Sequence, residues 1–220
     1  MTQTAPVAAR YDLRVRRGHS QTGRDPAGGR ESAVAYLDDD ALIAAGFRSL
    51  GANVRISDKA SIYDADRISI GDNTRIDDFC VLSGTITIGR NVHIAVFCNL
   101  AGGRAGITVC DFAGISYGSH LVAQSDDYSG ATMTGPTVPA EFKHETSEPI
   151  YIGRHTILGT NTVVLPGVTV PDGVSAGAHT LFTKSVEPWS VYVGSPAHRV
   201  KAREQGLLEM ERNYLRGESN

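Results

Sequence analysis

Aliphatic residues recur at every sixth position through most of the chain beyond Leu50. The recurrence runs through eighteen six-residue units, and a small or β-branched residue lies four places after the aliphatic one in sixteen of them. The aliphatic positions are Leu50, Ile56, Ile62, Ile70, Ile76, Leu82, Ile88, Ile94, Leu100, Val109, Ile115, Leu121, Ile152, Leu158, Val164, Val170, Ala176 and Phe182. This period predicts a parallel β-helix, in which hydrogen bonds between stacked coils satisfy the backbone. A β-sandwich is the alternative, because six is a multiple of two, but simple alternation would not hold a six-residue phase so long.

The six-residue phase is interrupted three times, after the third, ninth and twelfth units, by 2, 3 and 25 extra residues. Each interruption follows a multiple of three units. If three units make one coil of a triangular prism, all three insertions leave from the same edge. The pattern therefore predicts an all-β domain of about six triangular coils over residues 50–187, with a long loop insertion at 124–149.

Both ends of the chain differ from the repeat. Residues 1–36 are rich in arginine and glycine, which predicts a flexible basic arm. Residues 37–49 contain one short helix, with acidic residues at its start and a glycine at its end. Residues 188–220 form a tail, in which 201–215 has apolar residues at helical spacing. We therefore expect a short C-terminal helix.

Composition excludes several classes of protein. A net charge of -3 argues against a strongly basic nucleic-acid binder. No apolar run approaches the roughly 18 residues of a membrane span, and the N-terminus lacks the apolar core of a signal peptide. Three cysteines cannot form a complete disulfide set, and no short pair indicates zinc, so we expect a reduced, cytoplasmic location and no metal. Cys80, Cys98 and Cys110 occupy small-residue positions, where thiols pack.

The unit [LIV]-G-x-x-[STAV]-x, as in Ile70–Arg75 and Ile152–Ile157, resembles the repeat of the hexapeptide-repeat acyltransferases. Three further segments are similar to the C-terminal signature of that family: Val164–Val168, Thr183–Trp189 and Val193–Val200. The resemblance covers about residues 50–203 and is strongest to the galactoside and O-antigen sugar O-acetyltransferases. It implies a left-handed β-helix, a homotrimer, acetyl-CoA sites between neighbouring subunits, and O-acetylation of a sugar or glycoconjugate in polysaccharide biosynthesis.

Other functions fit the same repeat. An N-acyltransferase of an amino sugar or nucleotide sugar is the near alternative, since an amine needs less help from a base. A zinc hydrolyase similar to the γ-type carbonic anhydrases would place two histidines five residues apart, and no pair among the seven histidines has that spacing. A non-catalytic β-helix scaffold would fail to bind CoA, whereas the tail signature with Lys184 indicates CoA binding.

Acyl transfer needs a base, donors for the oxyanion and two aligned substrates. In the galactoside acetyltransferases the base is a histidine at the start of the loop, and the matching position here is Asp126, next to Asp127. Two adjacent carboxylates can raise one pKa by repulsion, or they can bind acceptor hydroxyls or an amine. We predict His93 as the base, oriented by or paired with a loop aspartate of a neighbouring chain. Expected acceptor contacts are Asn99, His120, Tyr128 and His144, with the two histidines as second choices for the base.

We expect CoA beside the C-terminal coils, where small residues leave backbone groups open to the pantetheine amides and basic residues face the phosphates. The predicted contacts are Gly159, Thr160, Gly177, Ala178, Lys184, Pro196, Arg199 and Arg203. The acceptor is expected to be a small sugar or nucleotide sugar. We expect neither nucleic acid nor a membrane span as a partner.

Overall fold

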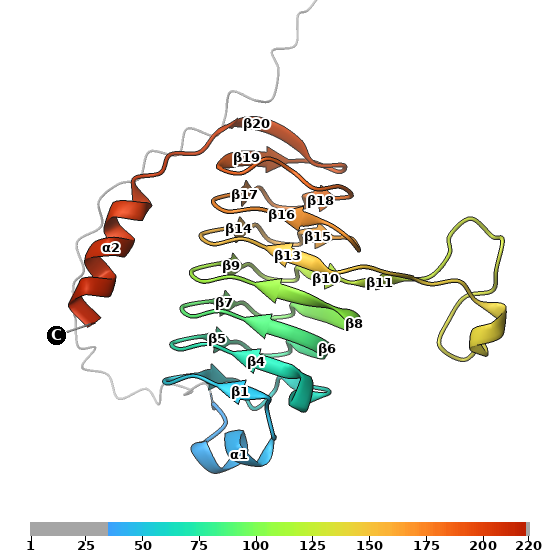
Figure 1. Ribbon diagram of the computed structural model, residues 1–220, viewed down its shortest axis with the longest axis horizontal. Coiled ribbons are helices and arrows are strands. Elements are labelled where there is room, and N and C mark those ends of the chain that lie inside the picture. Colours follow the sequence, from blue (N-terminus) through green and yellow to red (C-terminus); the bar gives the residue numbers. More distant parts are fainter. Residues whose placement is uncertain (1–34, 219–220) are drawn as a thin grey trace, which may run out of the picture. The chain divides into compact units, whose positions relative to one another are not determined.

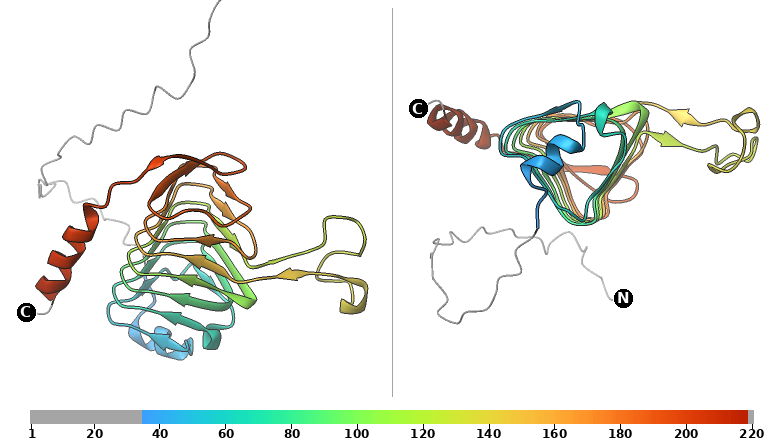
Figure 2. Two further views of the ribbon diagram at one scale, coloured as in Figure 1. Left: turned by 45° about the horizontal axis from the view of Figure 1, so that its top comes forward. Right: turned by 90° about the horizontal axis from the view of Figure 1, so that it is seen from below.

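The computed structural model describes residues 35–218, and the chain winds there into stacked triangular coils (Figure 1). Short strands follow one another around three faces, and most pair in parallel with the strand one coil further along. Seen along the axis, the coils form a triangle (Figure 2). This is the predicted all-β architecture, a left-handed parallel β-helix. The predicted basic arm falls, except for its last two positions, outside the described residues.

The three faces are named A, B and C in the order in which the chain crosses them. Face A consists of β1 (Ser49–Leu50), β4 (Ile68–Ile70), the second halves of β6 (Val81–Ile88) and β8 (Asn99–Val109), β13 (Ile150–Ile152) and β16 (Thr169–Val170). Face B consists of β2 (Arg55–Ile56), β5 (Arg75–Ile76), β7 (His93–Ile94), β9 (Gly114–Ile115), β14 (Ile157–Leu158), β17 (Ser175–Ala176), β19 (Ser190–Val193) and β20 (His198–Ala202). Face C consists of β3 (Ser61–Ile62), the first halves of β6 and β8, β10 (His120–Val122), β15 (Val163–Val164) and β18 (Leu181–Phe182).

The repeated aliphatic residues form the core. On face B, Ile76 is in register with Ile94, and Ile94 with Ile115, so the same position of each coil lies above the last. All three side chains are buried. The core is therefore one continuous column inside the triangle, as the six-residue period predicts.

The corners use a repeated backbone conformation. Nine non-glycine residues that lie three places after an aliphatic position have a positive φ: Asn53, Asn73, Phe79, Asn91, Phe97, Phe112, His155, Asn161 and His179. Asparagine tolerates this left-handed conformation better than most residues, whereas a phenylalanine there is unusual. The residue that follows is small and buried, as at Thr74, Cys80 and Thr162. Each corner thus turns one side chain outward and the next inward.

All three insertions leave from one edge, C/A, as predicted. The first contains the short 3-10 helix η2 (Ala65–Arg67), and the second widens the middle of β8. The third insertion, residues 124–149, is called the arm from here on and is distinct from the predicted basic segment at residues 1–36. It contains β11 (Gln124–Ser125), η3 (Ala140–Phe142) and β12 (Thr146–Ser147). Strands β11 and β12 pair antiparallel, and the arm extends away from its own coils (Figure 1).

The two ends of the described chain close the column. Helix α1 (Asp39–Ala44) begins at Asp38, whose carboxylate accepts a hydrogen bond from the Ala41 amide at 2.8 Å. At the other end, β19 adds to β17 as a partial seventh turn above the six predicted coils. Strand β20 then pairs antiparallel with β19, so the C-terminal helix α2 (Leu207–Glu218) starts later than position 201. No helix within residues 35–218 is both long and apolar enough to cross a membrane.

Candidate functional site

The B/C edge carries most of the predicted CoA-binding residues in one column. Gly159 and Thr160 follow β14, and Gly177 and Ala178 follow β17 one coil above. The turn that contains Pro196 follows β19, and its neighbour Ala197 donates a backbone hydrogen bond to Leu181. The structure therefore brings five of the eight predicted residues together on three successive turns.

The reason for the glycines differs from the expectation. A Cβ at Gly159 would lie 2.7 Å from the carbonyl oxygen of Ala176, so close stacking of the coils requires glycine there. The Gly159 amide donates to that same carbonyl, and the Gly177 amide donates to Tyr192. These two amides are already used between coils, and the prediction that they are open to a ligand is wrong.

The predicted cations lie apart from one another. Lys184 is exposed and follows β18, toward the C/A edge. Arg199 lies on β20, where its Nε donates to the Ser190 hydroxyl at 2.9 Å. The Nη1 of Arg203 donates to the carbonyls of His155, Gly173 and Val174, and burial lowers the pKa of this guanidinium. Arg203 is thus tied to the coils, while Lys184 and Arg199 remain candidates for phosphate contacts.

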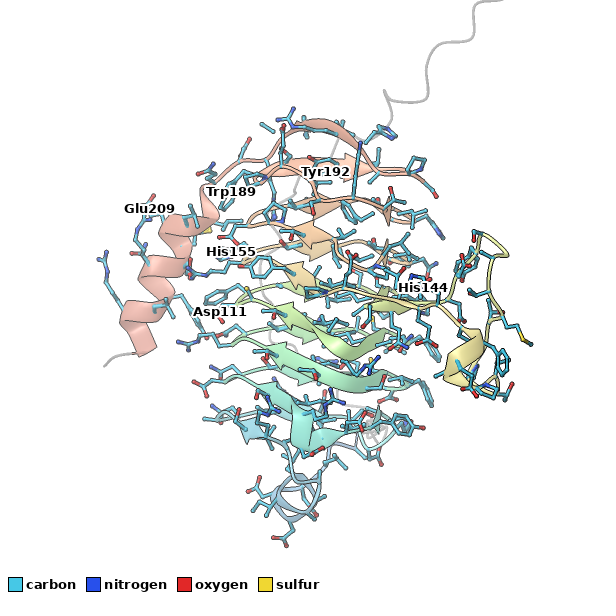
Figure 3. All side chains as sticks on the ribbon, turned by 45° about the vertical axis from the view of Figure 1, so that its right-hand side comes forward. Asp111, His144, His155, Trp189, Tyr192 and Glu209 are labelled. Atoms are coloured by element: carbon cyan, nitrogen blue, oxygen red, sulfur yellow. The ribbon has the colours of Figure 1, made fainter. Side chains whose placement is uncertain are left out.

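Helix α2 docks along the A/B edge. His155 Nε2 lies 2.8 Å from a carboxylate oxygen of Glu211, and Arg154 pairs with the other oxygen. The Phe112 ring stacks on His155 and meets Tyr214 edge-on. Figure 3 shows His155 on the side of the coils that faces α2. The His155 side chain therefore links the coils to α2.

The predicted base, His93, lies on face B and pairs with an aspartate of its own chain. Its Nε2 is 2.8 Å from Asp77 Oδ2, and Arg75 Nε donates to Asp77 Oδ1 at 2.5 Å. Asp77 is 5% exposed, whereas the imidazole is half exposed. The hydrogen bond to Asp77 raises the pKa of Arg75, and the Tyr36 and Tyr117 phenols act in the same direction. The chain thus presents an ordered Arg–Asp–His group.

Exposed aromatic rings lie on the lower B/C edge, below the predicted CoA column. Phe79 and Phe97 stack with ring centroids 5.1 Å apart and planes 13° apart. They are 50% and 61% exposed, and Tyr117, one coil higher, is also exposed. Lys59 lies over the Phe79 ring at 5.8 Å.

Two predicted acceptor contacts are neighbours on face C. Asn99 and His120 are register partners on adjacent coils, and the His120 side chain is exposed. At the root of the arm, Asp126 lines a hollow of about 320 Å³. The other lining residues are Ser83, Ala101, Gly103, Gln124, Ser125, Pro136 and Glu145. This hollow contains hydroxyl, amide and carboxylate groups, which suit the hydroxyls or the amine of a sugar.

Asp127 stabilises the arm instead of facing that hollow. Its carboxylate accepts hydrogen bonds from the Ser129 amide and from the amide and hydroxyl of Thr132. These bonds, those to Ser129 first, lower its pKa to about 2. The expectation that paired carboxylates raise a pKa therefore does not hold for Asp127. Tyr128 is 92% exposed beside it, and His144 lies further along the arm (Figure 3).

The predicted catalytic residues are not together within one chain. His93 lies on face B, and Asp126 lies at the opposite C/A edge.

The sequence pattern does not single out Ser116, which lies on the B/C edge directly below the Gly159 column. Ser116 follows its aliphatic residue at the position where other units have glycine, so the repeat pattern gives it no functional signal. Within residues 35–218, no cluster of three or more potential metal ligands occurs.

Comparison with known proteins identifies relatives. Residues 67–102 match the family described as bacterial transferase hexapeptide (six repeats). The dTDP-4-amino-4,6-dideoxy-D-glucose acyltransferase of Escherichia coli is 42% identical over 181 residues, which are 81% of this chain and 94% of that protein.

Among solved structures, AntD is similar: an N-acyltransferase from Bacillus cereus, in complex with dTDP and 3-hydroxybutyryl-CoA. It is 40% identical, covers 84% of this chain and 98% of its own, and superposes with a TM-score of 0.83. Another AntD complex contains dTDP-4-amino-4,6-dideoxyglucose and CoA. The AntD structures include variants at a serine and at an aspartate ten positions further on.

Proposed function

The chain belongs to the hexapeptide-repeat sugar acyltransferases, and from this membership we propose that it is a CoA-dependent N-acyltransferase of an amino sugar linked to a nucleotide. The observation that carries the proposal is similarity over 94% of a relative named for a 4-amino sugar nucleotide. This favours the N-acyl alternative over the O-acetylation of a sugar that the sequence resemblance implied. Polysaccharide biosynthesis and a cytoplasmic location stay predictions.

We place the reacting amine near Ser116 and Asp126. In the whole sequence, only this serine is followed ten residues later by an aspartate, which is the spacing of the two varied positions in AntD. The Asp126 carboxylate can accept a hydrogen bond from the amine, orient its lone pair and take up a proton. Acyl-CoA supplies a thioester, and transfer makes an amide and releases the CoA thiol. An amine is a stronger nucleophile than a hydroxyl, so a carboxylate suffices where an alcohol would need a histidine.

We further propose a homotrimer in which the site is shared between subunits. Ser116 and Asp126 lie at opposite borders of face C, and the arm points away from its own coils (Figure 1). A neighbouring chain can receive this arm, so that Asp126 of one subunit approaches Ser116 of the next. The upper B/C edge, with Gly159, Thr160 and Ala178, then holds the acyl donor above Ser116.

The proposal is tested by thiol release from acetyl-CoA, with dTDP-4-amino-4,6-dideoxyglucose and its 4-hydroxy analogue as acceptors. We expect turnover with the amine, and a product that resists neutral hydroxylamine because it is an amide. A product that hydroxylamine cleaves, or turnover only with the hydroxy sugar, would restore the O-acyl reading. No thiol release with either acceptor would refute the proposed function.

A further inference from the structure

We propose that the lower B/C edge, together with the adjoining part of face B, is the subsite for a nucleoside diphosphate. In this subsite Phe79 and Phe97 bind the base by stacking, and Arg75 and His93, ordered by Asp77, bind the diphosphate. The inference rests on the proposed function, because it assigns the nucleotide part of the acceptor to residues that no comparison identifies.

The aromatic pair has no role inside the coils. Both rings stand at positive-φ corners and turn outward, whereas the coils above them have Gly118, Asn161 and His179 at the same corner position, so the aromatic rings are confined to these two coils of the edge. Two stacked rings that are 50% and 61% exposed leave an apolar face open to solvent. A planar nucleobase covers such a face at little cost in hydrogen bonding, and base–aromatic stacking contributes strongly to nucleotide binding.

The charged group beside the rings suits a diphosphate. Arg75 and His93 are register partners on adjacent coils, so their side chains are about 4.8 Å apart along the axis. Asp77 binds Nε of Arg75 and Nε2 of His93, which leaves the guanidinium Nη atoms and the imidazole Nδ1 for a ligand. Arg55 is in register below Arg75 and adds a further positive charge that outweighs the buried carboxylate.

The position also fits the order of the groups in the substrate. The rings belong to the second and third coils, Ser116 to the fourth, and Gly159 and Gly177 to the fifth and sixth. A nucleotide sugar with its base at Phe97 would therefore reach upward toward Ser116, while the acyl donor reaches downward from Gly177. The two substrates would meet end to end on one edge.

Calorimetric titration of the full-length protein with dTDP, thymidine and inorganic pyrophosphate tests this assignment. The key variant is Phe97→Asn, because asparagine already adopts the same corner conformation at Asn91 and Asn161, so the coil is retained. We expect it to weaken dTDP and thymidine binding at least tenfold and to leave pyrophosphate unaffected. Arg75→Gln should weaken dTDP and pyrophosphate at least tenfold. Tyr63→Asn, an exposed tyrosine on the C/A edge, is the control and should change nothing.

Unchanged dTDP affinity in Phe97→Asn, or an equal loss in the Tyr63→Asn control, would overturn the subsite. A change in the oligomeric state of Phe97→Asn by light scattering would also overturn it, because the rings would then be an interface between copies. Acyl transfer by the wild-type protein separates the two proposals. If wild-type protein binds acyl-CoA and transfers its acyl group while Phe97→Asn binds dTDP normally, only the subsite fails. If wild-type protein transfers no acyl group, the proposed function itself fails.

Discussion

Asp126 and Asp127 are adjacent in the sequence, yet their carboxylates have different surroundings. Asp127 is the hydrogen-bond acceptor of a local turn in the arm, whereas Asp126 lines the hollow at the root of the arm. Asp126 Oδ1 accepts one hydrogen bond, from the Gly135 amide at 3.3 Å, but its place in the lining of the hollow leaves Oδ2 for a substrate. Two adjacent aspartates in a sequence do not reveal which carboxylate is free for a substrate, because this depends on which of them accepts hydrogen bonds from Ser129 and Thr132.

We expect Asp126→Asn to reduce kcat/KM about 100-fold, because the amide cannot take up a proton. Asp127→Asn should retain most activity, since its side-chain oxygen can still accept from the turn. The pKa of Asp127 is lowered to about 2, so its contribution to the arm is complete above the ordinary pKa and is lost only as pH falls toward 2. The pH profile of kcat/KM should therefore show no inflection from Asp127 above pH 4. An equal loss in both variants would remove Asp126 from its assigned role.

The buried cysteines are expected to be chemically inert. Cys80 Sγ donates to the Ala95 carbonyl and Cys98 Sγ to the Ser116 carbonyl, at 3.0 and 3.2 Å. The interaction with Cys98 and burial raise the pKa of the Cys80 thiol, whereas the hydrogen bond with Cys80 lowers the pKa of Cys98, so for Cys98 it is burial that keeps a reagent out. Titration of the native protein with a thiol reagent at pH 8 should thus modify Cys110 alone among the three. Rapid modification of all three thiols without denaturant would contradict this packing.

At the level of elements, the close approach of coils makes particular glycines indispensable. A Cβ at Gly71 would lie 2.6 Å from the backbone carbon of Gly89, with no flexible side chain to move aside. We expect Gly71→Ala to lower the free energy of unfolding by about 2 kcal/mol or more. Gly206→Ala is the matched control, since nothing lies within 4 Å of its added methyl group. Urea denaturation of both variants provides the measurement, and equal stabilities would argue against the stacked geometry.

The docking of α2 depends on one carboxylate. Glu211 pairs with both Arg154 and His155, and its side chain is 8% exposed. Glu211→Ala should lower the free energy of unfolding by about 1–3 kcal/mol, because it leaves two polar partners unpaired. Limited proteolysis should then cut near residue 206 faster than in wild type. Glu209→Ala, an exposed position on the same helix, should show neither effect.

Much of the β-helix can be predicted because aliphatic residues such as Ile76, Ile94 and Ile115 follow the six-residue period and all face inward. The partial seventh turn was not predicted, because Tyr192 replaces the aliphatic residue and falls outside the six-residue phase. The sequence pattern also predicts that the C-terminal helix starts at 201, whereas α2 starts at Leu207. Residues 198–202 can form a helix or a strand, and pairing with β19 decides between them. The sequence pattern does not identify Ser116, because its proposed role depends on its position on the B/C edge, and only the stacked coils define that edge.

For the whole molecule, a site shared between two subunits predicts a result that a site within one chain does not. Ser116→Ala and Asp126→Asn should each be nearly inactive alone. When the two variants are mixed during refolding, random trimers would contain intact sites, with one wild-type Ser116 and one wild-type Asp126, at about one quarter of all sites. Recovery of about that fraction of activity is therefore expected. No recovery from mixed trimers would show that one chain supplies both residues.

Because every insertion lies at the C/A edge, changes in the arm can occur independently of changes in the coils. Residues can be added or exchanged in the arm without shifting the rungs above or below, because the strands resume in register afterwards. If the arm contacts the acceptor as proposed, changes in its sequence can alter acceptor preference while the coils proposed to hold the acyl donor keep their structure. A chimera that carries another enzyme's arm should accordingly fold as before and accept a different sugar.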